Sequence, residues 1–196
     1  MGNIYLGSDW HFLTTPFRTD PSKNKKILDR YMRTIKDDYI FIFLGDLTYF
    51  NKDCPEVIKS QIEQIKSLPG KKIFIRGNND YENLNFYKSK MKFDLSKDIL
   101  IVDKFIFTHK PISLDERQVE KGYINIHGHI HGSKEYDEYY CDPINHADCY
   151  SNEYDFFPAK FEDVISGNCS FIQRDITETE IRNLYNKLYK HCKIGF

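Results

Sequence analysis

Seven side chains with oxygen or nitrogen donors follow short apolar stretches of this 196-residue chain. They occur in five blocks, "SDWH", "GDLT", "RGNND", "THKP" and "GHIH", each placed where a strand is expected to end. In chain order, the donors are Asp9, His11, Asp46, Asn78, His109, His129 and His131. Such carboxylate, imidazole and amide donors suit divalent ions such as Mn²⁺, Fe or Zn²⁺, and seven are too many for one four-coordinate site. The set therefore predicts two divalent metal ions that share a bridging carboxylate.

A metal pair of this kind supports a particular chemistry. Two ions ~3.5–4 Å apart clamp a phosphoryl group, lower the pKa of a bridging water and stabilise an in-line displacement at phosphorus. Each block taken alone has a simpler explanation. Asp9 and His11 can cap a helix or satisfy a turn, Asn78 can be a turn residue that tolerates left-handed backbone, and His109 can be a surface histidine. The five blocks together favour the metal site.

The elements that must position these blocks follow from the hydrophobic pattern. Strands are expected at 3–7, 39–45 and 71–77, and apolar residues recur at helical spacing between them, in 27–35 and 58–65. This βαβαβ order predicts a largely parallel sheet. Ligands gather at the carboxyl ends of the strands in such a sheet, which is where the first three blocks lie.

After residue 98 the sequence becomes strand-rich, which predicts a second sheet with antiparallel or mixed pairing. Strands are expected there at 99–103, 104–109 and 123–128. Thr177 and Glu180 match a helix-capping box, and the apolar residues that follow at helical spacing predict a last helix packed on the core. We expect a single domain over 1–196, with 167–196 as a C-terminal strand and helix extension packed on it.

Charge and composition limit the partners and the location. Twenty-eight Lys and Arg oppose 29 Asp and Glu, for a formal charge of -1, so nucleic acid is disfavoured as a partner. The sequence has no run of 18 apolar residues and no signal-type N-terminus, which predicts no membrane association and a cytoplasmic location. Five cysteines without a CxxC pair argue against a disulfide framework or a zinc ribbon. No pattern indicates the oligomeric state.

The order of the blocks, DxH, GD, GN, H and GHxH, resembles the pattern of the calcineurin-like metallophosphoesterases, closest to the small bacterial and phage-type members. The segment "INHADCYSNEYDFFPAKFEDVI", residues 144–165, is similar to a part of those proteins in which a strand precedes a helix. The resemblance covers about residues 3–166. It implies an α/β fold, a four-layer αββα sandwich of two mixed sheets flanked by helices.

The resemblance also implies how the metal ligands are shared. One metal ion would be held by Asp9, His11, Asp46 and His131, and the other by Asp46, Asn78, His109 and His129, with Asp46 as the bridge. His127 has no ligand role in the family pattern, so we expect a supporting role for it. His146 is expected to be solvated. Trp10 can stack on a base or pack beneath the site, and the sequence leaves both open.

Two positions depart from the family pattern. Asn79 stands where the family usually has a histidine that acts as general acid or phosphate ligand, and Tyr49 stands where many members have an aspartate that orients this histidine. An asparagine can hydrogen-bond a phosphoryl oxygen but cannot deliver a proton. The ~10²–10⁴-fold contribution of general acid catalysis is then missing for poor alkoxide leaving groups. We therefore expect a preference for phosphoanhydride, aryl or nucleotide leaving groups.

The expected function is hydrolysis of phosphoester or phosphoanhydride bonds in a small phosphorylated substrate, with a nucleotide as one candidate. A metal-bridging hydroxide would attack phosphorus, with Asp46, Asn78 and Asn79 as the catalytic residues. Asn79 and Arg76 are the candidate contacts to substrate, although a salt bridge at the strand end explains Arg76 equally well. Two alternatives stay open: a nuclease, disfavoured by the neutral charge, and a metal-bound scaffold or ligand-binding module that lost its catalytic step with the histidine.

Overall fold

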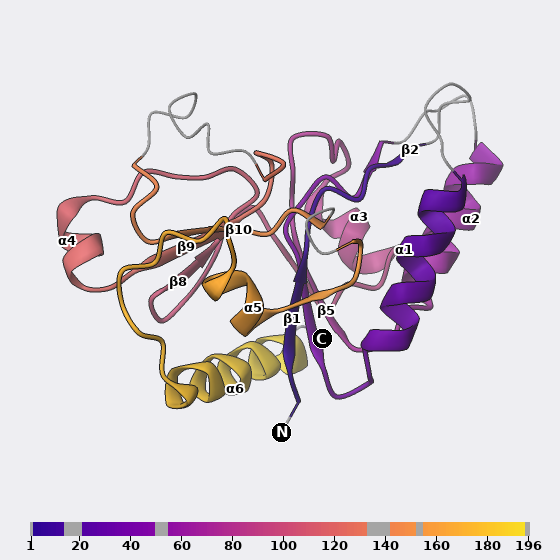
Figure 1. Ribbon diagram of the computed structural model, residues 1–196. Helices are drawn as coiled ribbons and strands as arrows, with labels where there is room; N and C mark the ends of the chain where they lie inside the picture. The colour runs from indigo at the N-terminus through magenta and orange to yellow at the C-terminus, as the bar shows by residue number, and fades with distance from the viewer. Residues whose placement is uncertain (1, 14–20, 50–54, 133–141, 152–154, 195–196) are drawn as a thin grey trace.

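Two mixed β-sheets flanked by helices form the protein, seen in a computed structural model that describes residues 2–13, 21–49, 55–132, 142–151 and 155–194 (Figure 1). The strands are β1 (Ile4–Gly7), β2 (Phe12–Leu13), β3 (Ile40–Phe43), β4 (Thr48–Tyr49), β5 (Lys71–Ile75), β6 (Leu95–Lys97), β7 (Leu100–Val102), β8 (Phe105–Phe107), β9 (Ile124–His127), β10 (His146–Asp148) and β11 (Ala159–Lys160). The helices are α1 (Pro21–Thr34), α2 (Pro55–Lys66), α3 (Leu84–Ser89), α4 (Glu116–Glu120), α5 (Phe161–Ser166) and α6 (Glu178–Ile194).

The first sheet has the strand order β11-β1-β3-β5-β6. Strands β1, β3, β5 and β6 run parallel, while β11 pairs antiparallel with β1. In this register Gly7 lies opposite Phe43, and Phe43 lies opposite Phe74. The predicted parallel βαβαβ core is therefore confirmed, and the carboxyl ends of β1, β3 and β5 lie side by side.

The central strand β3 of the first sheet is buried on both faces, which explains why it is continuously apolar. Ile40 and Ile42 point into a core shared with the second sheet, whereas Phe41 and Phe43 point into a core shared with α1, α2 and α3. Trp10 belongs to this second core, where its ring packs against Phe43 at a centroid distance of 4.9 Å. Of the two roles left open for Trp10, the structure supports packing.

The second sheet has the strand order β10-β9-β8-β7, with β7 antiparallel to β8 and the other pairs parallel. The predicted mixed second sheet is thus confirmed. Its inner face meets the first sheet through residues such as Phe107 and Ile126. Helix α4 lies on the side of this sheet away from α1 and α2 (Figure 1). A small third pair, β2 with β4, extends the loops that follow β1 and β3.

Helix α6 begins with the predicted capping box. Thr177 Oγ1 accepts from the Glu180 amide at 3.2 Å, and Glu180 Oε2 accepts from the Thr177 amide at 2.9 Å. Leu184 and Leu188 are fully buried in the core between the sheets, so the apolar face of α6 is a packing face as predicted. No helix within the described ranges is long and apolar enough to cross a lipid bilayer.

Candidate metal centre

The loops after β1 and β3 run side by side because their backbones are hydrogen-bonded. The Asp9 amide donates to the Gly45 carbonyl at 2.9 Å, and the His11 amide donates to the Asp46 carbonyl at 2.9 Å. The second sheet joins them where the His129 amide donates to Asp9 Oδ2 at 3.1 Å. Loops that follow strands far apart in sequence therefore lie next to one another, as the positions of the donor blocks predicted.

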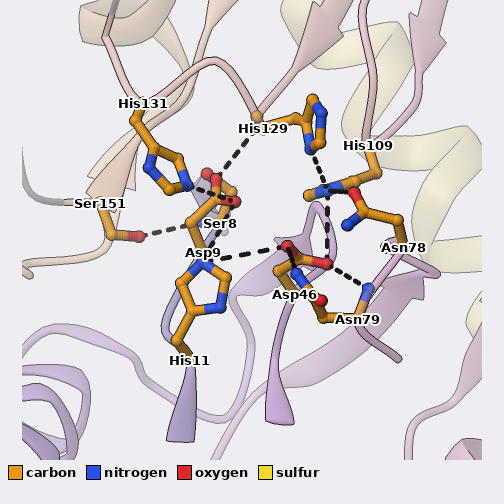
Figure 2. Close-up of polar contacts among 12 residues, drawn as sticks. Ser8, Asp9, His11, Asp46, Asn78, Asn79, His109, His129, His131 and Ser151 are labelled. Atoms are coloured by element: carbon orange, nitrogen blue, oxygen red, sulfur yellow. Dashed lines mark hydrogen bonds and ion pairs between the residues drawn. The ribbon is translucent and has the colours of Figure 1, made fainter. Parts of the chain in front are cut away.

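The structure brings the seven predicted donors together in two groups at this point (Figure 2). The first group is Asp9, His11 and His131, and the second is Asp46, His109 and His129; within each group the ligand atoms lie within 4.8 Å of one another. The seventh donor, Asn78, joins the second group through its Oδ1, 3.0 Å from His109 Nε2. Each group contains one carboxylate and two imidazoles, a donor set suited to a divalent transition metal.

Asp46 lies between the two groups and turns one oxygen toward each (Figure 2). Its Oδ1 is 3.3 Å from Nε2 of His109, and its Oδ2 is 3.9 Å from Nε2 of His11. A carboxylate in this position can bind one ion with each oxygen. This is the geometry that a shared ligand between two metals requires.

Two ligand atoms in the first group support metal binding because they are buried and lack hydrogen-bond partners among the described residues. In the described part of the chain, Asp9 Oδ1 and His11 Nε2 are buried without a hydrogen-bond partner. Buried polar atoms are nearly always satisfied, and an orphaned one calls for an explanation such as an ion. The residues present therefore fit a divalent cation held between Asp9, His11 and His131.

Backbone strain is concentrated at the same residues. Five of the candidate ligands have positive φ: Asp9 (55°), His11 (47°), Asp46 (55°), His129 (73°) and His131 (53°). Positive φ is uncommon for non-glycine residues and clusters at functional sites, where the surrounding structure holds it in place. The left-handed turns aim successive side chains from short loops at one point, which a regular strand could not do.

Two glycines let the loops approach this closely. A Cβ on Gly77 would lie 2.2 Å from Asp46 Oδ1, and a Cβ on Gly128 would lie 2.6 Å from Asp9 Oδ2. Any larger residue would displace a candidate ligand. Both positions therefore need a glycine for the backbone to approach the site this closely.

Burial and neighbouring charges set the protonation of the ligands. Burial by itself would raise the pKa of Asp9 and of Asp46, but hydrogen bonds and the positive charge of nearby histidines hold both below the ordinary value. Burial, together with the charge of His109, lowers the pKa of His129 to about 4, and burial also lowers the pKa of His11. Asp9 and Asp46 are therefore ionised, and His11 and His129 are neutral, near pH 7, which are the forms that bind metal. Burial would lower the pKa of His109, but the neighbouring Asp46 carboxylate raises it, and the contact with Asp9 raises the pKa of His131.

Asp80 fixes the loop that carries Asp46. Its carboxylate accepts from four backbone amides, those of Gly77, Asp46, Leu47 and Thr48, at 2.8 to 3.3 Å. Asp80 belongs to the "RGNND" block, but no motif in that block predicts these four hydrogen bonds. The only local signal is its place two residues after a candidate ligand.

A second supporting segment comes from residues 148–151, which begin with the last residue of β10. Asp148 Oδ2 accepts from the Gly132 amide at 2.7 Å, the Tyr150 ring stacks on His131, and Ser151 Oγ accepts from the Ser8 amide at 2.9 Å. Each contact reaches a neighbour of Asp9 or His131, or His131 itself. Sequence reasoning assigned no role to this tyrosine-rich part of the chain.

Asn79 contacts the Asp46 carboxylate. Its backbone amide donates to Asp46 Oδ1 at 2.9 Å, and its side-chain amide donates to Asp46 Oδ2 at 2.6 Å. The side chain of Tyr49, the other departure from the family pattern, lies outside the described residues. Arg76 forms an ion pair with Asp98, with Nη2 2.6 Å from Oδ1, which supports the structural alternative for this arginine.

The two spare histidines beside the site are both buried. His127 is fully buried, and its Nδ1 lies 2.9 Å from the Gly128 carbonyl oxygen, which agrees with a supporting role. The prediction that His146 is solvated is wrong, because it is fully buried in β10, with its ring 5.6 Å from that of His127. Burial lowers the pKa of both imidazoles, to about 3 for His127 and about 4 for His146.

Comparison with known proteins identifies the class that this fold and site define. A family model of calcineurin-like phosphoesterases matches residues 2–170, so the chain belongs to that family. It is 31% identical over 149 residues to an uncharacterized protein, MJ1445, of Methanocaldococcus jannaschii, covering 71% of this chain and 74% of that protein. The crystal structure of a protein of unknown function, AQ665, from Aquifex aeolicus has the same fold at 22% identity, with a TM-score of 0.58 over 85% of this chain and 99% of the other.

Proposed function

We propose that this chain is a metal-dependent hydrolase of phosphoester or phosphoanhydride bonds in a small phosphorylated substrate. The observation that carries the proposal is the position of Asp46, with one oxygen toward His11 and the other toward His109. Two divalent ions bound on either side of it would neutralise phosphoryl oxygens and lower the pKa of a water between them. Asp9, His11 and His131 would hold one ion, and Asn78, His109 and His129 would hold the other.

The protein's own residues set the geometry of the reaction. Asp46 keeps both ligand groups at a fixed separation, because four amide hydrogen bonds to Asp80 hold its loop. Asn79 aligns the Asp46 carboxylate through both of its oxygens. A substrate phosphoryl group at this point would therefore meet positions that are already arranged, which is the main source of catalysis in such sites.

We further propose a preference for leaving groups that are stable as anions. Asn79 occupies the place beside Asp46 from which a side chain could reach a leaving oxygen, and its amide can donate a hydrogen bond but no proton. An alkoxide leaving group needs a proton in the transition state, whereas a phosphate or phenolate does not. Nucleotide anhydrides and aryl esters are accordingly the favoured substrate classes.

The test combines metal analysis with a panel of three substrates. The protein is loaded with Mn²⁺, its metal content is measured, and turnover is compared on an aryl phosphodiester, an alkyl phosphodiester and a dinucleotide polyphosphate. We expect two ions per chain and the slowest turnover on the alkyl diester. Equal rates on all three would contradict the leaving-group preference, and a metal-free, inactive protein would overturn the proposed function.

One observation favours a second candidate, a metal-bound scaffold or ligand-binding module. Asn79 lies at the position of the usual acid and donates to Asp46, so the site resembles one that keeps its ligands without proton transfer. The Asp46→Asn variant separates the candidates. An enzyme would lose turnover, whereas a scaffold would keep its partner while showing no turnover even as wild type.

The remaining assignments follow from charge and composition. A net charge of -1 disfavours nucleic acid as the substrate, so we retain a small phosphorylated molecule as the partner. We keep a cytoplasmic location as a prediction. Manganese is the metal used for the first assays because its oxygen and nitrogen preferences match the donor set.

A further inference from the structure

We infer that Tyr150 is a positioning residue that holds His131 in its ligating orientation and thereby sets the metal affinity of the Asp9–His11–His131 group. The Tyr150 and His131 rings are stacked, with centroids 4.7 Å apart and planes inclined by 11°. This inference rests on the proposed metal centre. It adds a residue from a part of the chain with no assigned function.

His131 needs such support more than the other candidate ligands do. Its side chain is 49% exposed, whereas that of His109 is 4% exposed. Its backbone is in the left-handed region, and it precedes Gly132, which also has positive φ. An exposed imidazole on a strained turn has rotamer freedom that it must lose on metal binding. A flat aromatic neighbour removes part of that freedom in advance.

The stack sets the direction in which His131 points. Nε2 of His131 lies 3.4 Å from Asp9 Oδ1, the buried oxygen without a hydrogen-bond partner in the described part of the chain. The His131 ring also meets the His11 ring edge-on, at 5.6 Å and 75°. Tyr150 thus stacks on an imidazole whose Nε2 is turned toward the other ligands of its group.

Tyr150 itself is well placed for this task because both of its neighbours in sequence are anchored near the site. On one side, Cys149 is fully buried and its amide donates to the His127 carbonyl at 2.7 Å. On the other, Ser151 Oγ accepts from the amide of Ser8, next to Asp9. The segment is therefore fixed to the same loops as the ligands and can transmit its position to His131.

The experiment measures metal binding instead of turnover. Mn²⁺ is titrated into the metal-free protein by calorimetry, and the bound ions are followed by electron paramagnetic resonance, which distinguishes single from paired manganese. Tyr150→Leu and Tyr150→Met remove the flat ring, whereas Tyr150→Phe keeps it. His131→Ala is the reference for loss of this half of the site.

We expect Tyr150→Leu and Tyr150→Met to lower the affinity for one of the two ions by the ~10–100-fold typical of supporting residues around a metal. The affinity for the other ion should be unchanged. Tyr150→Phe should bind as wild type. The matched control is Tyr189→Leu, which removes a stacked, half-buried tyrosine from α6, far from the site in sequence (Tyr185–Tyr189, centroids 5.8 Å apart).

Three results with the Tyr150 variants would overturn the inference: wild-type affinity in both Tyr150→Leu and Tyr150→Met, equally weakened binding of both ions, or a loss of affinity in Tyr150→Phe as large as in Tyr150→Leu. Weaker metal binding in Tyr189→Leu would mean that losing a stacked tyrosine destabilises the protein in general. That result would also overturn the inference. Failure of the proposed function looks different, because the wild-type protein itself would then bind no paired ions.

Discussion

The two halves of the proposed metal centre each contain one carboxylate and two imidazoles but differ in how firmly the protein holds them. In the buried half, His109 is fixed at both nitrogens, by the Leu44 carbonyl at 2.8 Å and by Asn78 Oδ1 at 3.0 Å. In the exposed half, His131 is open to solvent and His11 Nε2 has no hydrogen-bond partner within the described residues. The ligands of the buried half are thus held in place by the protein itself, whereas those of the exposed half would be fixed only by a bound metal ion.

This difference predicts which half should bind metal more tightly. Fixed ligands lose little conformational entropy on binding, so the buried half should fill first and empty last. The exposed half should exchange its ion more readily with solution. Five substitutions, the first two compared as a pair, would break or sharpen this contrast.

The largest effect is expected from the pair His109→Ala and His131→Ala. Each variant should lose one ion, but His109→Ala should also lower the free energy of unfolding by ~1–3 kcal/mol, because it leaves the buried Leu44 carbonyl without its partner. His131→Ala should unfold within ~0.5 kcal/mol of wild type. Metal analysis and chemical denaturation of the metal-free proteins measure both quantities. Equal destabilisation by the two variants would contradict the contrast.

Asp80→Asn should follow, with an effect that reaches both halves, because Asp80 holds the loop of the shared Asp46. The amide group replaces one acceptor oxygen among four backbone donors, which should cost ~1–3 kcal/mol of unfolding free energy. Affinity for both ions should fall by ~10–100-fold, as for other groups that orient ligands. Asp98→Asn, at an exposed carboxylate, is the matched control, and an equal loss there would refute the role of Asp80.

Asn79→His should produce a smaller and selective change. A histidine can deliver a proton, so turnover of an alkyl phosphodiester should rise relative to an aryl one. The gain should stay below the ~10²–10⁴-fold of a fully oriented acid, because Tyr49 replaces the usual orienting aspartate. Steady-state kinetics on both substrates measure the ratio. An unchanged ratio would show that Asn79 acts only on Asp46.

Arg76→Ala should have the smallest effect. Its guanidinium is paired with Asp98 near the surface, and such pairs contribute ~0–1 kcal/mol. We expect little change in stability and no change in KM. A clear rise in KM at constant kcat would instead restore Arg76 as a substrate contact, in line with the other interpretation of the sequence.

The candidate ligands could be predicted from the sequence because each follows an apolar strand. Asp9, Asp46 and Asn78 come after the three parallel strands, and a parallel sheet brings its carboxyl ends together. The polar residues that follow the β-strands in the sequence therefore predicted which side chains lie close together. The helix capped by Thr177 was equally predictable, since a capping box and an apolar stripe are local signals.

The supporting residues could not be predicted because their partners are distant in sequence. Asp80 contacts a loop 32 to 34 residues earlier, and Ser151 contacts Ser8 across 143 residues. His146 was placed in solvent because nothing local shows that β10 pairs with β9. Tyr150 lies in a tyrosine-rich segment, and no local pattern distinguishes it from the other tyrosines there. Long-range pairing, rather than any local motif, decides these roles.

The positive φ angles at Asp9, His11 and Asp46 have a consequence for the evolution of this chain. Left-handed backbone costs a residue with a Cβ roughly 1–2 kcal/mol, and glycine avoids most of it. A glycine at any of these positions would relieve the strain while removing a ligand. Selection for thermal stability alone would thus favour substitutions that remove the candidate metal ligands, so these residues persist at a cost in stability.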